Sequence, residues 1–533
     1  MNDLTVEVYD TTLRDGAQQE GMNLSVSDKM AIAALLHELG VGVIEGGWPG
    51  AVPKDTEFFG LASKELPFFR THFAAFGMTR RAGSTAAADP QVRALLDSEA
   101  PIITLVAKSD IRHAERALKV SGDENLRMIE ETVAFLVGEG RRVLLDAEHF
   151  FDGYAYDPDY AVKALLAGQA GGASTLVLCD TNGGMLPDDV ARVVEAVAVL
   201  TDAPLGMHAH NDSGCAVANS MAAVAAGARH VQGCVNGYGE RTGNADLVAV
   251  VANLELKKGA RALAPGGLRE ATRISHAISE ITNITPYQRQ PYVGASAFAH
   301  KAGLHASAIK VDPDLYQHTD PAHVGNDMRM LVSEMAGRAS IELKGRELGF
   351  DLAGQGELLT RVTERVKNAE AVGYTFDAAD ASFELLLRSE LGEAHKYWVM
   401  ENWRVRVSSL PEDPTNADAE AEITLIAGGG QRIVQVGVGN GPVNALDHAL
   451  RAALTGVYPC IDRFELTDFK VRIMDASHGT DAVTRTLITT VDTETGMAWS
   501  TVGVGPNIIE AAWEALTDSL LYGLLKAGVT PQP

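Results

Sequence analysis

Short β-rich runs alternate with helical patterns through roughly the first half of the chain. The runs occupy residues 5–9, 41–45, 71–76, 102–106, 142–146, 174–179, 204–208 and 230–235. Regular alternation of a strand with a helix is typical of parallel sheets. Eight such units in ~250 residues favour a closed (β/α)8 barrel, the TIM barrel, over a doubly wound open sheet. We therefore predict an α/β barrel over residues 1–265.

Residues 266–395 are dominated by helical patterns, of which 268–281 and 356–369 are the clearest. Between these two lies a polar, histidine-rich stretch from His300 to Gly337. We predict helical linker subdomains here, with functional side chains embedded in them.

Residues 396–533 show six alternating strands, at 403–408, 420–426, 432–438, 464–474, 484–491 and 497–504. The tetrapeptide Val-Gly-Val-Gly occurs at 436–439 and again at 502–505, each time after about three strands and before a helical pattern. Two βββα copies predict an α+β domain with pseudo-twofold symmetry. Glycines before a helix leave backbone N–H groups free for a carboxylate, so this domain is a candidate regulatory module for an amino-acid effector.

Charge and composition exclude several classes of protein. The net charge of −25 over 533 residues argues against a nucleic-acid partner, which requires a basic surface. The chain shows no signal-peptide pattern and no stretch of ~18 apolar residues, so we expect no membrane association. None of the four cysteines is paired at CxxC spacing, which argues against a zinc cage or a disulfide framework. We expect a cytoplasmic protein.

Candidate metal ligands lie at the predicted C-terminal ends of the barrel strands, where TIM-barrel active sites are built. Asp15 follows the first strand, His208 and His210 end the seventh, and Asn244 follows a glycine-rich loop after the eighth. Residues two apart on a strand face the same side, and strand eight neighbours strands one and seven in a closed barrel. We predict that these side chains converge on Mg²⁺ or Mn²⁺, with zinc as the alternative.

Further polar groups end the neighbouring strands. Arg14 precedes Asp15 and can hold a carboxylate or an enolate oxygen. Strand five ends at Glu148 and strand six at Thr181, although helix capping would also explain the latter. Outside the barrel, a neutral histidine in the segment around His305 could serve as a general base.

Three motifs together resemble the family of 2-isopropylmalate, homocitrate and citramalate synthases. They are Thr11-Thr12-Leu13-Arg14-Asp15-Gly16, His208-Ala209-His210-Asn211-Asp212 and Gly237-Tyr238-Gly239-Glu240-Arg241-Thr242-Gly243-Asn244. The strings at 46–50 and 146–154 are most similar to its long-chain citramalate synthase branch, and the resemblance covers essentially the whole chain. Many 2-isopropylmalate synthases carry a proline shortly after the first motif, and residues 17–21 lack it.

The resemblance implies a role for each matching position. It implies metal ligation by Asp15, His208, His210 and Asn244, substrate contacts by Arg14 and Thr181, and catalysis by Arg14, Glu148, His305 and Tyr316. His300 is the rival of His305 for the role of base.

The resemblance also implies an acyltransferase that condenses acetyl-CoA with a small 2-oxo acid and acts as a homodimer. The C-terminal repeat predicts feedback inhibition by isoleucine, or by leucine if the protein is a 2-isopropylmalate synthase. With pyruvate the product is citramalate, on the way to isoleucine. The alternatives are 2-isopropylmalate synthase in leucine biosynthesis and, third, homocitrate synthase. These enzymes differ mainly in the size of the pocket around the side chain of the 2-oxo acid. The candidate lining residues of that pocket are Gly47, Phe76, Leu105 and Asp146.

Two further hypotheses assign the chain to other classes of protein, a lyase and a non-catalytic sensor. A 3-hydroxyacyl-CoA lyase on this barrel would lack the duplicated C-terminal domain. A non-catalytic amino-acid sensor would not need an intact set of metal ligands.

Overall fold

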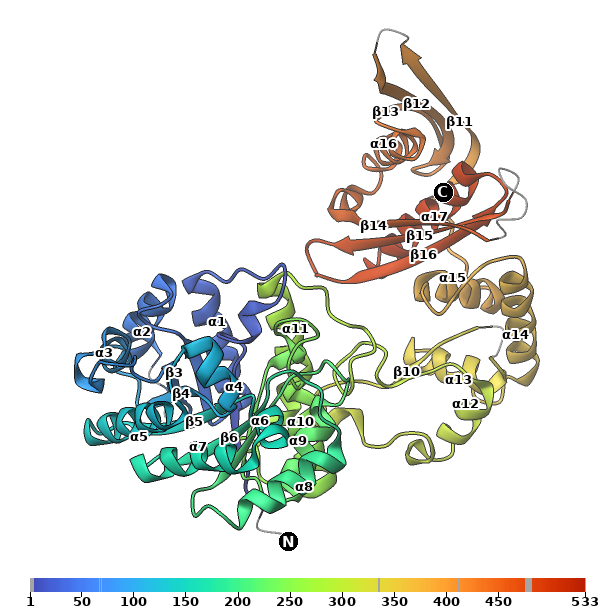
Figure 1. Cartoon of the computed structure of the whole chain (residues 1–533). Coiled ribbons are helices and arrows are strands. Elements are labelled where there is room, and N and C mark those ends of the chain that lie inside the picture. The colour runs from blue at the N-terminus through green and yellow to red at the C-terminus, as the bar shows by residue number, and fades with distance from the viewer. Residues whose placement is uncertain are drawn as a thin grey trace. The chain divides into compact units, whose positions relative to one another are not determined.

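The computed structural model describes residues 4–66, 68, 70–333, 336–410, 413–474 and 482–532 (Figure 1). The chain forms two compact units, each described by itself. The first runs to Phe298 and includes Thr319–Asp327, and the second comprises Ala299–His318 and the chain from Met328 onward. No helix among the described residues has both the length and the apolar character that a membrane crossing requires. The three-part division expected from the sequence stays a prediction.

A closed barrel of eight parallel strands forms the centre of the first unit (Figure 1). The strands are β1 (Glu7–Asp10), β2 (Val43–Gly47), β3 (His72–Met78), β4 (Ile102–Lys108), β5 (Arg142–Glu148), β6 (Thr175–Asp180), β7 (Leu205–Ala209) and β8 (His230–Gly233). β1 pairs with β2 on one side and with β8 on the other, which closes the ring. The predicted TIM barrel is confirmed, and every predicted run overlaps its strand.

The helices of the first unit follow the strands in alternation. They are α1 (Val26–Leu39), α2 (Pro53–Glu65), α3 (Pro90–Asp97), α4 (Ile111–His113), α5 (Gly122–Gly138), α6 (Phe150–Tyr156), α7 (Pro158–Gly171), α8 (Pro187–Ala198), α9 (Ala216–Ala225), α10 (Leu247–Lys258) and α11 (Ala271–Thr282). Local sequence fixes their ends: α1 begins at a capping box formed by Ser25 and Asp28 and ends at Gly40 in the left-handed conformation.

The inside of the barrel is layered. Tyr9, Val43, Ala74, Ile102 and Leu144 form one small buried cluster. Side chains two residues further along a strand face the same side, and on β2, β4 and β5 these positions are Glu45, Thr104 and Asp146, all buried. A polar layer therefore lies directly above an apolar one, at the carboxyl ends of the strands.

The second unit begins with small helical subdomains. They contain β9 (Ala299–His300), α12 (Gly303–Ile309), β10 (Arg329–Met330), α13 (Arg338–Glu347), α14 (Gly356–Ala371) and α15 (Asp380–Leu391). A separate hydrophobic core, which includes Ile341, Val362 and Phe383, holds α13, α14 and α15 together.

The C-terminal part contains the predicted βββα unit twice (Figure 1). The first copy is β11 (Val399–Leu410), β12 (Asp413–Ala427), β13 (Gln431–Gly439) and α16 (Pro442–Leu454). The second is β14 (Phe464–Ile473), β15 (Thr484–Asp492), β16 (Ala498–Gly505) and α17 (Ile508–Lys526). Both sheets are antiparallel, and the predicted duplication is confirmed.

The repeated glycine lets each helix pack closely against its own strand. A Cβ atom on Gly437 would lie 2.4 Å from the carbonyl oxygen of Ala445, and one on Gly503 would lie 2.0 Å from that of Ala511. The spacing between glycine and contacted residue is the same in both copies. Close packing thus explains the repeated glycine. At the N-terminus of α17, the Asn507 side chain accepts a backbone N–H group, so that N–H is not free for a carboxylate.

Gly503→Ala is expected to destabilise the C-terminal domain by about 1–3 kcal/mol, because backbone atoms of α17 cannot make room for the added methyl group. Gly505→Ala is the matched control, since the nearest atom to its new Cβ would be 3.8 Å away. Thermal unfolding of the two variants measures the difference, and equal midpoints would contradict the packing account.

Candidate active site

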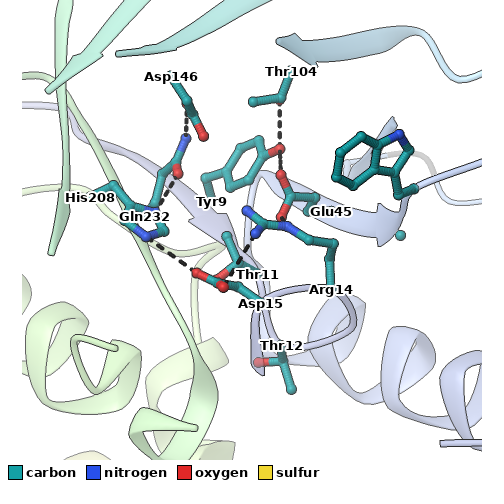
Figure 2. Close-up of polar contacts among 12 residues, drawn as sticks. Tyr9, Thr11, Thr12, Arg14, Asp15, Glu45, Thr104, Asp146, His208 and Gln232 are labelled. Carbon is teal, nitrogen blue, oxygen red and sulfur yellow. Dashed lines mark hydrogen bonds and ion pairs between the residues drawn. The ribbon is translucent and has the colours of Figure 1, made fainter. Parts of the chain in front are cut away.

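Three of the predicted metal ligands meet at the carboxyl end of the barrel. The Nε2 atoms of His208 and His210 lie 3.3 Å apart, and the Asp15 Oδ2 atom lies 3.2 Å from the first and 3.8 Å from the second. All three side chains are buried, and each offers one ligand atom within 4.8 Å of the others. Figure 2 shows Asp15 and His208 facing each other across the site.

Asn244 is the fourth predicted ligand, and backbone pairing with His210 brings it to the same place. Its Nδ2 atom donates to Asp15 Oδ2 at 2.7 Å, and its buried Oδ1 atom has no hydrogen-bond partner within the described part of the chain. Gly239 adopts a φ of 146°, and a Cβ there would lie 2.1 Å from Asn244 Oδ1. A carboxylate, two imidazoles and an unpartnered amide oxygen fit a divalent cation.

The electrostatics of Asp15 and His210 suit a cation, whereas at His208 the hydrogen bond and the charge of Asp15 outweigh burial and raise the pKa of the imidazole. Burial favours a neutral Asp15, but the Arg14 guanidinium and the nearby imidazoles outweigh it and hold the pKa of this carboxyl well below its usual range. Burial, and then repulsion from His208, lower the pKa of His210 to about 4. A carboxylate and a neutral imidazole are the protonation states that metal binding requires.

Arg14 is held rigidly beside this cluster (Figure 2). Its Nε atom donates to Glu45 Oε2 at 2.6 Å, its Nη1 atom lies 3.2 Å from Asp15 Oδ1, and the guanidinium lies 3.8 Å from the centre of the Phe76 ring. Glu45 is in turn fixed by the Tyr9 hydroxyl at 2.8 Å. An arginine so oriented can bind a carboxylate or a developing oxyanion.

A cavity of about 350 Å³ lies over these groups and is also lined by Glu148, Thr181, Trp48 and Phe76. Glu148 forms an ion pair with Lys108. The Thr181 Oγ atom accepts the backbone N–H of His149 at 2.8 Å, so its hydroxyl proton is available to a ligand. Glu148 and Thr181 therefore lie where the sequence predicted, and their roles remain predictions.

The predicted lining was partly wrong. Phe76 and Asp146 line the cavity, but Gly47 and Leu105 do not. Leu105 packs into the hydrophobic core outside the barrel because side chains alternate along β4, and Val106 and Lys108 face the cavity instead.

His305, Tyr316 and His300 belong to the second unit. The rings of His305 and Tyr316 stack with centroids 4.1 Å apart, and the His300 ring lies 6.3 Å from that of His305. Burial and the nearby His305 lower the pKa of His300. The direct pairing supports the joint assignment of His305 and Tyr316, while their part in catalysis stays a prediction.

The sequence did not predict two buried residues, Glu45 and Gln232, that hold predicted site residues in place. Glu45 and Gln232 are buried in β2 and β8, and each contacts a predicted site residue. A charged or amide side chain inside an otherwise apolar strand was the available signal.

Family models and relatives match nearly the whole chain. Residues 5–277 match the HMGL-like family model, 292–373 the homocitrate synthase post-HMGL domain-like model, and 377–524 the LeuA allosteric (dimerisation) domain. The chain is 60% identical over 530 residues to the (R)-citramalate synthase of Streptomyces coelicolor, covering 99% of this chain and 98% of that protein. The (R)-citramalate synthase of Synechocystis sp. is 45% identical over 537 residues, with 98% and 97% covered.

The chain belongs to the citramalate synthase family.

Membership in this family makes the protein an enzyme and confirms the resemblance seen in the barrel motifs. A 2-isopropylmalate synthase of Synechococcus sp. is less similar, at 30% identity over 554 residues with 99% and 96% covered. The HMGL-like family is metal-dependent, and the cluster of Asp15, His208 and His210 could hold the ion.

Proposed function

We propose that the protein condenses acetyl-CoA with pyruvate to give (R)-citramalate and CoA, an acyl transfer in which the acyl group becomes an alkyl group. The convergence of Asp15, His208, His210 and Asn244 beside a fixed Arg14 carries the proposal. A lyase is disfavoured by the duplicated C-terminal domain, and a sensor by the intact ligand set.

Asp15, His208, His210 and Asn244 would hold Mg²⁺ or Mn²⁺, and the bound ion would supply Lewis-acid polarisation of the carbonyl of the 2-oxo acid. Thr181 donates its hydroxyl proton to the substrate carboxylate. His305, supported by Tyr316, removes a proton from the acetyl methyl group, and the resulting carbon attacks the keto carbon. Arg14 stabilises the negative charge that develops on the keto oxygen, and Glu148 assists proton transfer. Water then cleaves the thioester and releases CoA.

Pocket size supports pyruvate as the 2-oxo acid. The rings of Trp48 and Phe76 meet edge to face with centroids 5.4 Å apart, and both line the cavity beside Arg14. Two large rings there leave room for the methyl group of pyruvate more readily than for a branched side chain. CoA release measured in parallel with pyruvate, 2-oxobutanoate, 2-oxoisovalerate and 2-oxoglutarate tests this. Faster turnover of 2-oxoisovalerate would favour the 2-isopropylmalate synthase alternative.

A second cavity, of about 460 Å³, offers a place for the long arm of acetyl-CoA. It shares Trp48, Met78, Thr79 and Leu118 with the cavity over the metal ligands. Its remaining lining includes Met128 and Arg81, and the guanidinium of Arg81 is exposed and has no ion-pair partner among the described residues. A cavity lined by several apolar side chains and by the exposed Arg81 suits a pantetheine arm followed by phosphates.

Arg81→Ala is therefore expected to raise KM for acetyl-CoA about tenfold, the value of one charge-assisted contact, and to leave KM for pyruvate unchanged. Arg116→Ala is the matched control, since Arg116 is also exposed and has no ion-pair partner in the described part of the chain, but it lines a different cavity. Steady-state kinetics with both substrates measure the effect. A larger rise in Arg116→Ala would place the phosphates in that other cavity.

The C-terminal domain is proposed to form a homodimer and to bind an amino-acid effector, as the matched allosteric (dimerisation) model suggests. Isoleucine is the expected inhibitor, because it is the end product of the pathway that citramalate feeds. Adding isoleucine to the full-length protein should lower the rate of CoA release, and leucine should have less effect. A rate insensitive to both amino acids would contradict the assignment, and light scattering measures the oligomeric state.

A further inference from the structure

A chain of hydrogen bonds runs from the partly buried Glu7 through the barrel interior to one of the predicted metal ligands. The His230 Nδ1 atom lies 2.9 Å from Glu7 Oε2, and the His230 Nε2 atom lies 3.4 Å from Gln232 Nε2. The same Gln232 nitrogen lies 3.0 Å from Asp146 Oδ1. The Gln232 Oε1 atom lies 2.8 Å from His208 Nδ1 (Figure 2).

This arrangement fixes which way the Gln232 amide points. An amide presents two N–H donors on one side and an acceptor oxygen on the other. A neutral His230 ring that donates its Nδ1 proton to Glu7 presents Nε2 as an acceptor, and the Gln232 Nε2 atom donates to Asp146 Oδ1. Both acceptors face the amide nitrogen of Gln232, which leaves its oxygen directed at His208.

The amide orientation in turn determines the tautomer of His208. Because Gln232 Oε1 can only accept, the proton of the neutral His208 ring resides on Nδ1. The lone pair is then on Nε2, which lies 3.2 Å from Asp15 Oδ2 and 3.3 Å from His210 Nε2. His210 differs, because its buried Nδ1 atom has no partner within the described residues.

We propose that Gln232 is a positioning residue that holds His208 in the tautomer and ring orientation needed to bind the divalent cation. Hydrogen bonds of this kind behind a ligating histidine contribute tenfold to 100-fold to metal affinity. The proposal rests on the metal site of the proposed function, but not on the identity of the 2-oxo acid.

Mn²⁺ binding to the metal-free, full-length protein tests the proposal, with free Mn²⁺ measured by electron paramagnetic resonance. Gln232→Met keeps the length of the side chain and removes both amide groups, so the Kd for Mn²⁺ should rise tenfold or more. Gln232→Glu keeps an acceptor for His208 Nδ1 and should retain most of the affinity. Retained Mn²⁺ affinity in Gln232→Glu, together with its loss in Gln232→Met, would show that Gln232 orients His208 and does not merely fill space in the barrel.

Gln290→Met is the matched control, since Gln290 is also buried and donates to Asn236 and Asp246 but contacts none of the predicted ligands. It should bind Mn²⁺ like the wild type. If Gln232→Met does not fold, Gln232→Asn, whose shorter side chain withdraws the oxygen from His208, gives the same comparison.

Folded Gln232→Met or Gln232→Asn protein with wild-type Mn²⁺ affinity would overturn the proposal, and so would a wild type that binds no Mn²⁺. A wild type that binds Mn²⁺ but forms no citramalate would contradict only the proposed function. In that case the comparison of Kd values still decides the role of Gln232.

Discussion

Asp15→Asn is expected to lower the rate of CoA release from acetyl-CoA and pyruvate by about three orders of magnitude, the scale of losing a metal-centred electrostatic contribution. The substitution preserves the shape of the side chain but removes the negative charge at the centre of the cluster. The two imidazoles and Arg14 then surround a neutral group, so a divalent cation binds weakly. A thiol reagent that follows free CoA measures the rate.

Asp10→Asn is the matched control for this prediction. Asp10 is also a buried carboxyl at the end of β1, but it accepts hydrogen bonds from the backbone N–H and the hydroxyl of Thr12 and does not belong to the ligand cluster. Its replacement should leave activity within tenfold of the wild type. Equal losses in both variants would mean that Asp15 acts through folding alone.

Arg14→Lys is expected to reduce kcat about 100-fold or more, because an ammonium group cannot reproduce the planar fork of the guanidinium. Arg14 contacts Glu45, Asp15 and the face of Phe76 at once, and a lysine cannot satisfy all three. The loss should fall mainly on kcat, since the charge stabilised by Arg14 develops during the reaction.

Arg142→Lys provides the comparison for Arg14→Lys. Arg142 forms two hydrogen bonds with Glu7 near the opposite end of the strands, and it does not line the cavity. This variant should lose some stability and little kcat. A kcat for Arg14→Lys near the wild-type value would contradict a catalytic role for Arg14.

The sequence predicted the barrel and the four candidate ligands because each depends on a local pattern. Alternation marked the strands, and the polar side chains at the end of β7 and in the loops after β1 and β8 stood out against apolar runs. Closure of the ring, which brings Asp15 beside His208 and Asn244, follows from the strand order alone.

The supporting residues could not be predicted in the same way. Glu45 acts on Arg14 from a neighbouring strand, and Gln232 connects β8 to His208 on β7 and Asp146 on β5. Such contacts depend on the register between strands, which no spacing along a single strand reveals. The prediction that Leu105 lines the cavity was wrong for a related reason. The sequence of β4 does not show which of its two faces points into the barrel.

The mass of the product made from pyruvate and acetyl-CoA with a trideuterated acetyl group tests the central claim most directly. Metal-loaded, full-length protein should release citramalate that has kept two of the three deuterium atoms, because one is removed from the methyl group before the carbon–carbon bond forms. Trideuterated acetate with unchanged pyruvate would show thioester hydrolysis without condensation and would contradict the account.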